Sequence, residues 1–175
     1  MYFTSRDIAA IAVCSALWGV LNTFISPIFW QLTHMPFLCD MLAFMALILV
    51  IWWTRKFGAA SLVGLVVAGM TFMVNPTAFQ MLGFVVASIV FDIVTRLLGY
   101  ERLFKNLTLG GMILVVISVL CTGLAGTIIG IFFMGFRTVQ AILMFAGLHA
   151  IGGLIGGIIG VVLVKALGAR RVKPT

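Results

Sequence analysis

The sequence predicts an all-α polytopic membrane protein that forms a single domain over residues 1–175. Two observations indicate this class. First, 63% of the 175 residues are hydrophobic and only 9% are charged, whereas the surface of a soluble domain of this size must still face water. Second, apolar runs of about 18 residues or more, the length of a membrane-spanning helix, recur along the whole chain. No linker is long enough to join two domains.

The first apolar run is expected to form a transmembrane helix over residues 7–27. Almost no basic residues precede it and further apolar runs follow it, so a transmembrane helix is favoured over a cleaved signal peptide. Proline disrupts a helix interior but is tolerated in a first turn. Pro27 is therefore expected to end this helix and Pro36 to open the next one, over 37–54. The prediction leaves a loop from Ser26 to Pro36.

Four more spans follow from the positions of turn residues and charges. Glycine, proline, asparagine and clustered charges interrupt the remaining apolar sequence. These breaks predict spans over 58–75, 79–98, 107–135 and 138–167, which gives six transmembrane helices in total. The last two exceed what a hydrocarbon core of about 30 Å requires, so we expect tilt or a bend near Gly123 and Gly126.

The basic residues predict the orientation of the chain. With six spans, both termini lie on one side of the membrane, and the opposite side holds only Arg137 of the eleven Lys and Arg residues. Basic residues favour the cytoplasmic side, so both termini are expected there and the Ser26–Pro36 loop outside. This placement explains the net charge of +7 without a nucleic-acid partner. The remaining basic residues are Arg6, Arg55, Lys56, Arg96, Arg102, Lys105, Lys165, Arg170, Arg171 and Lys173.

Polar and aromatic residues gather near the predicted outer face. They lie at the ends of the third, fourth and sixth spans and in the first outer loop: Asn75, Gln80, Gln140, Trp30 and His34. Polar groups at one depth indicate a ligand cavity open to one side, because a continuous channel would need them throughout. The alternative for Trp30 is a place in the interfacial aromatic belt, and the alternative for His34 is a solvated loop position.

Asp40 is expected one turn inside the second span. A carboxylate at a helix centre costs about 2.5–3.5 kcal/mol on insertion, and less near the interface, so an intramembrane acid indicates a functional site. Asp40 therefore joins the candidate ligand site. The alternative is an acid near the surface that is solvated or paired with Arg137.

Other polar residues are assigned structural roles. Arg96 follows Asp92 by one helical turn, which predicts an ion pair within the fourth span. His149 shares a helix face with several glycines, where a bond to a neighbouring helix is expected. No metal site is predicted, because the cysteines are odd in number and lie inside or beside spans: Cys14, Cys39 and Cys121.

Small residues recur at helical spacing in two spans. The first span carries Ala9, Ala12 and Ala16, and the sixth carries a glycine series from Gly152 to Gly160. Such spacing lets helix backbones approach closely in lipid. Each series is interpreted either as packing within the protein or as a flat face for another membrane subunit.

Catalytic motifs are absent from the sequence. It contains no phosphate-binding glycine–lysine loop, no H-E-x-x-H and no G-x-S-x-G, and its loops are too short to carry a catalytic domain. Neither enzymatic activity nor a cofactor is expected.

Over its whole length the chain resembles the substrate-binding S-component of energy-coupling factor (ECF) transporters. The segment Ala12-Val13-Cys14-Ser15-Ala16 is similar to the AxxxA motif of that family, and Arg55-Lys56-Phe57-Gly58-Ala59-Ala60 looks like its tight inner turn. The resemblance implies a plasma-membrane protein with two kinds of partner: a transmembrane coupling subunit, in contact with the alanine face, and two ABC ATPases. The nickel and cobalt branch begins with Met-His, whereas this chain begins Met1-Tyr2, which argues against that branch.

The resemblance also implies a site and a mechanism. A vitamin or related micronutrient would be captured from outside and released inward when the subunit topples. The lid would be Trp30 to His34, and the wall would include Asn75, Gln80 and Gln140. Trp30, His34 and Asp40 would together suit an aromatic cation such as thiamine, or a pyrimidine precursor. Two alternatives remain: a small integral subunit of another membrane complex, and a stand-alone secondary transporter, whose polar residues should reach both faces.

Overall fold

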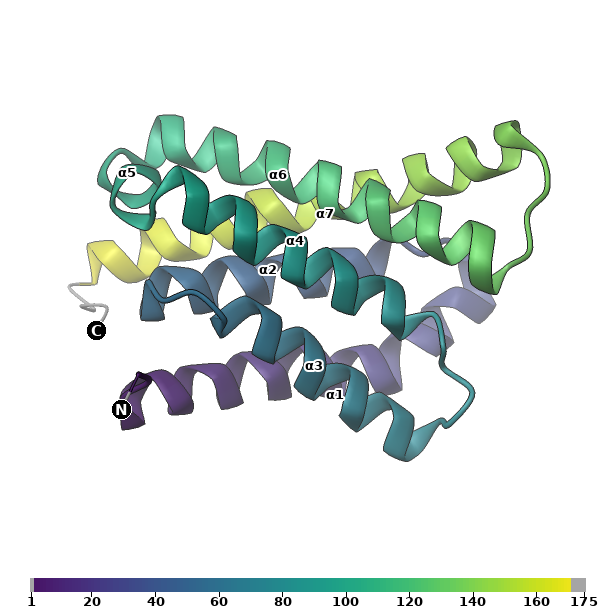
Figure 1. Ribbon diagram of the computed structural model, residues 1–175, viewed down its shortest axis with the longest axis horizontal. Coiled ribbons are helices and arrows are strands. Elements are labelled where there is room, and N and C mark those ends of the chain that lie inside the picture. The colour runs from purple at the N-terminus through teal and green to yellow at the C-terminus, as the bar shows by residue number, and fades with distance from the viewer. Residues whose placement is uncertain (1, 171–175) are drawn as a thin grey trace.

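The computed structural model describes residues 2–170, which form a bundle of helices (Figure 1). Six long helices run along the bundle, the short α5 lies at one end, and a π-helical segment, η1, continues α6. Their bounds are α1 Ser5–Thr33, α2 Phe37–Thr54, α3 Ala59–Val74, α4 Met81–Leu98, α5 Tyr100–Lys105, α6 Leu107–Ile128, η1 Ile129–Phe133 and α7 Val139–Ala169. The prediction of an all-α protein is confirmed.

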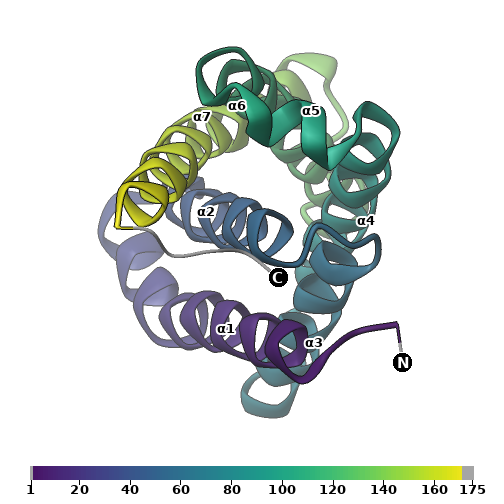
Figure 2. The same ribbon diagram turned by 90° about the vertical axis from the view of Figure 1, so that its left-hand side faces the viewer.

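The second helix forms the core of the bundle. Viewed along the bundle, α2 lies inside a ring made by α1, α3, α4, α6 and α7 (Figure 2). Phe44, Leu47 and Ile48 on α2 are almost completely buried. A helix that is apolar all round is expected to be buried, and the apolar sequence of α2 from Met41 to Trp53 explains its central position.

Five helices of the described chain are long and apolar enough to cross a membrane: α1, α2, α4, α6 with η1, and α7. The prediction of a multi-pass membrane protein is confirmed to that extent. The helix α3 is apolar but has only 16 residues, or about 24 Å at 1.5 Å per residue. The sixth span and the cytoplasmic location of the termini stay predictions.

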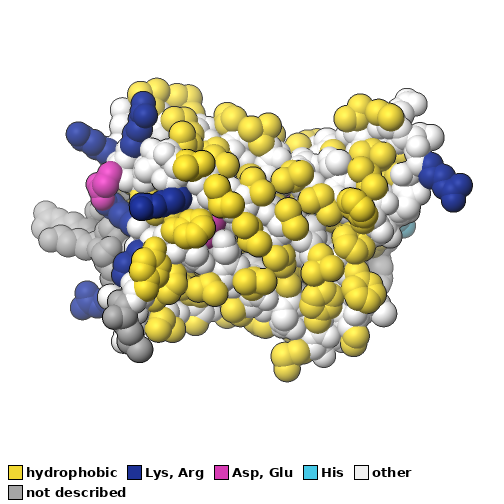
Figure 3. Space-filling model, in the orientation of Figure 1, with side chains coloured by type: hydrophobic (Ala, Val, Ile, Leu, Met, Phe, Trp, Pro, Cys, Tyr) yellow, Lys and Arg dark blue, Asp and Glu magenta, His cyan; other side chains and the backbone are white. Residues whose placement is uncertain are grey.

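Basic side chains gather at one end of the bundle, which we call the basic end. This end contains the start of α1 at Ser5, the turn that joins α2 to α3, the short helix α5 and the end of α7 at Ala169 (Figures 1 and 3). Arg137 lies in the connection between η1 and α7, at the opposite end. The described basic residues therefore have the uneven distribution on which the predicted orientation rests.

The predicted loop from Ser26 to Pro36 is wrong, because α1 continues through Pro27 to Thr33. Proline removes one backbone hydrogen bond from a helix, but surrounding contacts maintain the last turns. The Thr33 hydroxyl donates to the Phe29 carbonyl at 2.8 Å, and Phe29 packs edge-on against Phe37 with ring centroids 5.1 Å apart. His34 then ends the helix with φ of 54°, so the connection to α2 comprises residues 34–36.

The predicted ion pair between Asp92 and Arg96 is also wrong. Asp92 Oδ2 accepts three hydrogen bonds of 2.9 Å from the start of α3: from the backbone N–H groups of Gly58 and Ser61 and from the Ser61 hydroxyl. The first N–H groups of a helix have no intrahelical acceptor, and here a carboxylate on α4 supplies one. Asp92 therefore caps a neighbouring helix.

The glycine series of α7 packs inside the protein. A Cβ atom on Gly156 would lie 2.5 Å from the Met41 carbonyl oxygen on α2, and one on Gly157 would lie 3.1 Å from the Val115 Cα on α6. Only glycine permits such close backbone approach. The interpretation of this series as internal packing is confirmed for these positions, and the contacts place α7 directly against α2 and α6.

A candidate ligand cavity at the end opposite the basic residues

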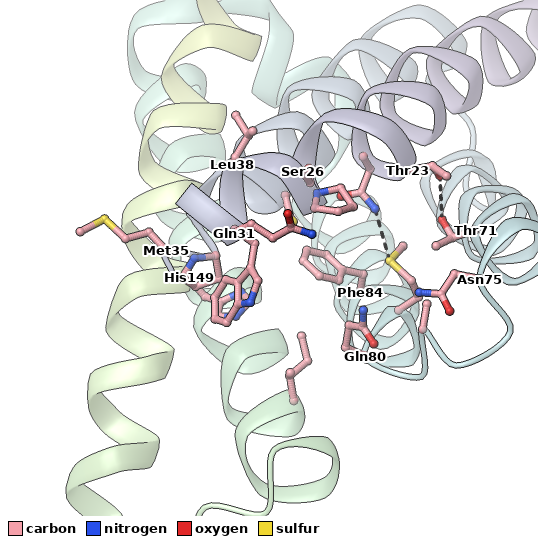
Figure 4. Close-up of a pocket in the computed structure, with 18 of the residues that line it drawn as sticks. Thr23, Ser26, Gln31, Met35, Leu38, Thr71, Asn75, Gln80, Phe84 and His149 are labelled. Carbon is pink, nitrogen blue, oxygen red and sulfur yellow. Dashed lines mark hydrogen bonds between the residues drawn. The ribbon is translucent and has the colours of Figure 1, made fainter. Parts of the chain in front are cut away.

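A cavity of about 300 Å³ opens in the half of the bundle away from the basic end. Residues from α1, α2, α3, α4, η1 and α7 line it, and Figure 4 shows Gln31, Gln80, Phe84 and His149 around the same space. The complete lining is Asn22, Thr23, Ser26, Pro27, Trp30, Gln31, Met35, Pro36, Leu38, Cys39, Thr71, Val74, Asn75, Ala78, Gln80, Met81, Phe84, Ile129, Met134, Phe145 and His149.

Three buried polar side chains of the lining have atoms without a protein partner. Asn22 is 7% exposed, Ser26 4% and His149 2%. The Asn22 amide nitrogen donates to the Met81 sulfur at 3.5 Å, but Asn22 Oδ1, Ser26 Oγ and His149 Nε2 have no hydrogen-bond partner among residues 2–170. Buried polar groups are nearly always satisfied, so these atoms lack a partner that a bound ligand or a water molecule would supply.

Aromatic side chains surround this polar group. Trp30 is 36% exposed, whereas Phe84 and Phe145 are almost buried. Phe84 packs edge-on against Trp18 with centroids 6.1 Å apart, which supports it from behind. Rings of this kind give a flat ligand large contact area, and the few polar atoms fix its orientation.

Asp40 lies behind His149 and outside the cavity lining. Its side chain has no exposed surface, and Oδ2 lies 2.8 Å from His149 Nδ1, within ion-pair range. The short distance makes this contact an ion pair, although its angles do not meet the criteria for a hydrogen bond. Gly152 on α7 stands directly against Phe37 and the Asp40 Cβ, which brings the two helices close enough for this contact. The alternative of a surface acid paired with Arg137 is therefore wrong.

The predicted site residues separate into two groups. Trp30, Asn75 and Gln80 line the cavity, although Asn75 Oδ1 already accepts hydrogen bonds from the backbone and hydroxyl of Thr77. His34 and Gln140 are exposed and do not line it. His34 lies beside Trp30, with ring centroids 6.0 Å apart.

Sequence reasoning missed several lining residues. Asn22 and Ser26 lie one helical turn apart in the first apolar run, and polar residues repeated on one face of a transmembrane helix are a signal that could have identified them. His149 was assigned a bond to a neighbouring helix, and it does contact Asp40 on α2, but it also lines the cavity. Phe84 and Phe145 carry no such signal, because apolar residues surround them in the sequence.

Comparison with protein-family models and with curated protein sequences finds no match. A solved structure described as "Crystal structure of an S-component of ECF transporter" matches with a TM-score of 0.63 and 19% sequence identity, over 97% of this chain and 88% of that one. The chain therefore has the fold of an ECF transporter S-component, as the sequence resemblance predicted. Together with the apolar helices, this fold supports a multi-pass membrane protein.

Proposed function

We propose that this chain is the substrate-capturing membrane subunit of an ECF-type importer and binds a vitamin or related micronutrient from outside the cell. The observation that supports this function is the cavity of about 300 Å³, which combines aromatic walls with buried, unpartnered polar atoms in an S-component fold. Its volume is at the lower end of small-molecule sites, about 300–1,000 Å³. Substrate capture is a binding function and requires no catalytic group.

The lining favours a flat, uncharged or weakly cationic ligand. No Lys, Arg, Asp or Glu of residues 2–170 lines the cavity, so a strongly anionic ligand would have no cation to pair with. Of the three residues that suggested an aromatic cation, Trp30 lines the cavity, His34 lies beside the Trp30 ring, and Asp40 reaches the cavity only through His149. Thiamine and its pyrimidine precursor are the first compounds to test.

The partners of this proposal are a transmembrane coupling subunit and two ABC ATPases, since the chain has no nucleotide-binding motif. Ala9, Ala12 and Ala16 are exposed along one side of α1. By contrast, the glycine series of α7 from Gly152 to Gly160 packs against α2 and α6 inside the protein. The alanine face is therefore the surface we assign to the coupling subunit.

Mass spectrometry of small molecules released from the purified protein tests the proposed function. We expect a flat, nitrogen-containing micronutrient, and we expect Trp30→Ala to weaken its equilibrium binding by about tenfold or more, because a buried aromatic contact contributes more than 1 kcal/mol. Phe24→Ala is the matched control, because Phe24 is an exposed aromatic residue on the same helix outside the lining.

Two outcomes would contradict this proposal. Equal weakening by both variants would show that Trp30 has no special role in binding. A solitary chain that takes up solute after reconstitution without any ATPase would favour the stand-alone secondary transporter.

A further inference from the structure

Four neighbours hold His149 in one orientation. Its Nδ1 lies 2.8 Å from Asp40 Oδ2, and its ring contacts Phe145 edge-on at 4.7 Å and Phe84 at 6.0 Å between centroids. Gly126 on α6 lies behind the ring, so close that an added Cβ would be 2.8 Å from His149 Cδ2. His149 lines the cavity, and its other ring nitrogen, Nε2, has no hydrogen-bond partner in the part of the chain that the structure describes.

The surroundings of the Asp40–His149 pair determine its charge. Both side chains are almost completely buried, and no Lys or Arg in the described chain lies within ion-pair distance of Asp40. A buried net charge without a partner costs far more than a neutral pair. A neutral pair holds two protons on the carboxylate and the two ring nitrogens. With one at the close approach of Oδ2 and Nδ1, the other is assigned to Nε2, because an imidazole nitrogen is more basic than the remaining carboxylate oxygen.

We propose that His149, positioned by Asp40, is the specificity-determining residue of the cavity and offers an N–H donor from Nε2. It selects a ligand that places an uncharged hydrogen-bond acceptor, a ring nitrogen or a carbonyl oxygen, at the buried end of the cavity. The inference rests on the proposed function and adds the chemical group that the site recognises. Since an unpaired buried donor is costly, a ligand of the same shape without the acceptor should bind about 10- to 100-fold more weakly.

The protonation of Nε2 can be measured without a ligand. The chain contains two histidines, so His34→Gln leaves His149 as the only imidazole in protein labelled with nitrogen-15 histidine. We expect an NMR signal from Nε2 with a directly bonded hydrogen in the ligand-free protein. An Nε2 without a hydrogen would overturn the inference, and this result does not depend on whether the protein is a transporter subunit.

Binding of thiamine and of its two analogues with one pyrimidine nitrogen replaced by C–H tests the selection. Wild-type protein should prefer thiamine to one of the analogues by about 10- to 100-fold. His149→Gln should keep this preference, because its amide also donates, and His149→Met should bind all three compounds alike. A His149→Met variant that still discriminates, or wild-type protein that binds thiamine and both analogues equally, would refute the role of His149.

Gly126→Ala provides a second variant that keeps the imidazole. The added methyl group would collide with the ring and should reduce the same preference, whereas Gly123→Ala on the same helix meets nothing within 4 Å and should leave it unchanged. If thiamine does not bind at all, the proposed ligand is wrong, while the NMR measurement still decides the protonation of Nε2.

Discussion

At the scale of single residues, the buried carboxylates of Asp40 and Asp92 connect helices that are far apart in the sequence. Asp92 on α4 accepts three hydrogen bonds from Gly58 and Ser61 at the start of α3. Gly58, the residue just before α3, has a φ of 93°. Asp40 on α2 faces His149 on α7. In both cases a group that is costly in an apolar environment lies against a specific polar partner on another part of the chain.

Replacing Asp92 with Ala is therefore expected to destabilise the protein. Three donors at the start of α3 would lose their acceptor, at a cost of about 1–3 kcal/mol for each one that stays buried. Thermal unfolding in detergent should show a clearly lower midpoint for Asp92→Ala. Arg96→Ala is the control, because Arg96 makes none of these bonds, and an equal loss in both variants would restore the ion pair that the sequence suggested.

At the scale of helices, two series of small residues have different roles. Four glycines of α7 face α2 or α6 at places where an added Cβ would meet backbone atoms: Gly152, Gly153, Gly156 and Gly157. The alanines of α1 lie on its exposed side. Both series have the spacing that brings helices together in lipid, so only the alanines remain available for a separate subunit.

Changing Ala12 and Ala16 to Trp should block transport without affecting capture of the substrate. The large rings would hold the coupling subunit away from α1, while the cavity lies among other residues. Uptake by the assembled transporter and ligand binding to the isolated chain should be measured side by side. Leu17→Trp, on the same helix about 100° away from Ala16, should transport normally, and loss of binding in the alanine variants would indicate misfolding instead.

At the scale of the whole molecule, charge and polarity lie at opposite ends. Basic residues gather at the end that holds α5 and Ala169 (Figure 3), and the cavity opens in the other half. The polar lining does not extend to the basic end, in agreement with a subunit that captures solute from one side. Because basic residues favour the cytoplasmic side, the cavity is expected to face outward.

Cysteine labelling of intact cells tests this orientation. In a variant without Cys14, Cys39 and Cys121, the exposed positions Arg137 and Lys105 are each replaced by Cys. A membrane-impermeant reagent should label Arg137→Cys in intact cells and Lys105→Cys only after permeabilisation. The reverse pattern would invert the proposed direction of capture.

Local sequence was sufficient to predict the class of the fold and most helix positions. A run of apolar residues long enough to cross a membrane forms a helix there almost regardless of its neighbours, because lipid leaves no other way to satisfy the backbone. The same reasoning located Trp30, Asn75 and Gln80 near the cavity. It failed at Pro27, where contacts of the following turns maintain a helix that the local sequence alone would end.

The sequence by itself determined that this chain is a multi-spanning helical protein with an uneven distribution of charge, because hydropathy and charge act locally. Only the tertiary structure decided which buried polar groups meet. Asp40 faces His149 because glycines let α7 approach α2, and Asp92 caps α3 because α4 lies beside it. Helix packing sets these distances between segments far apart in the chain, and no periodicity within one helix specifies them.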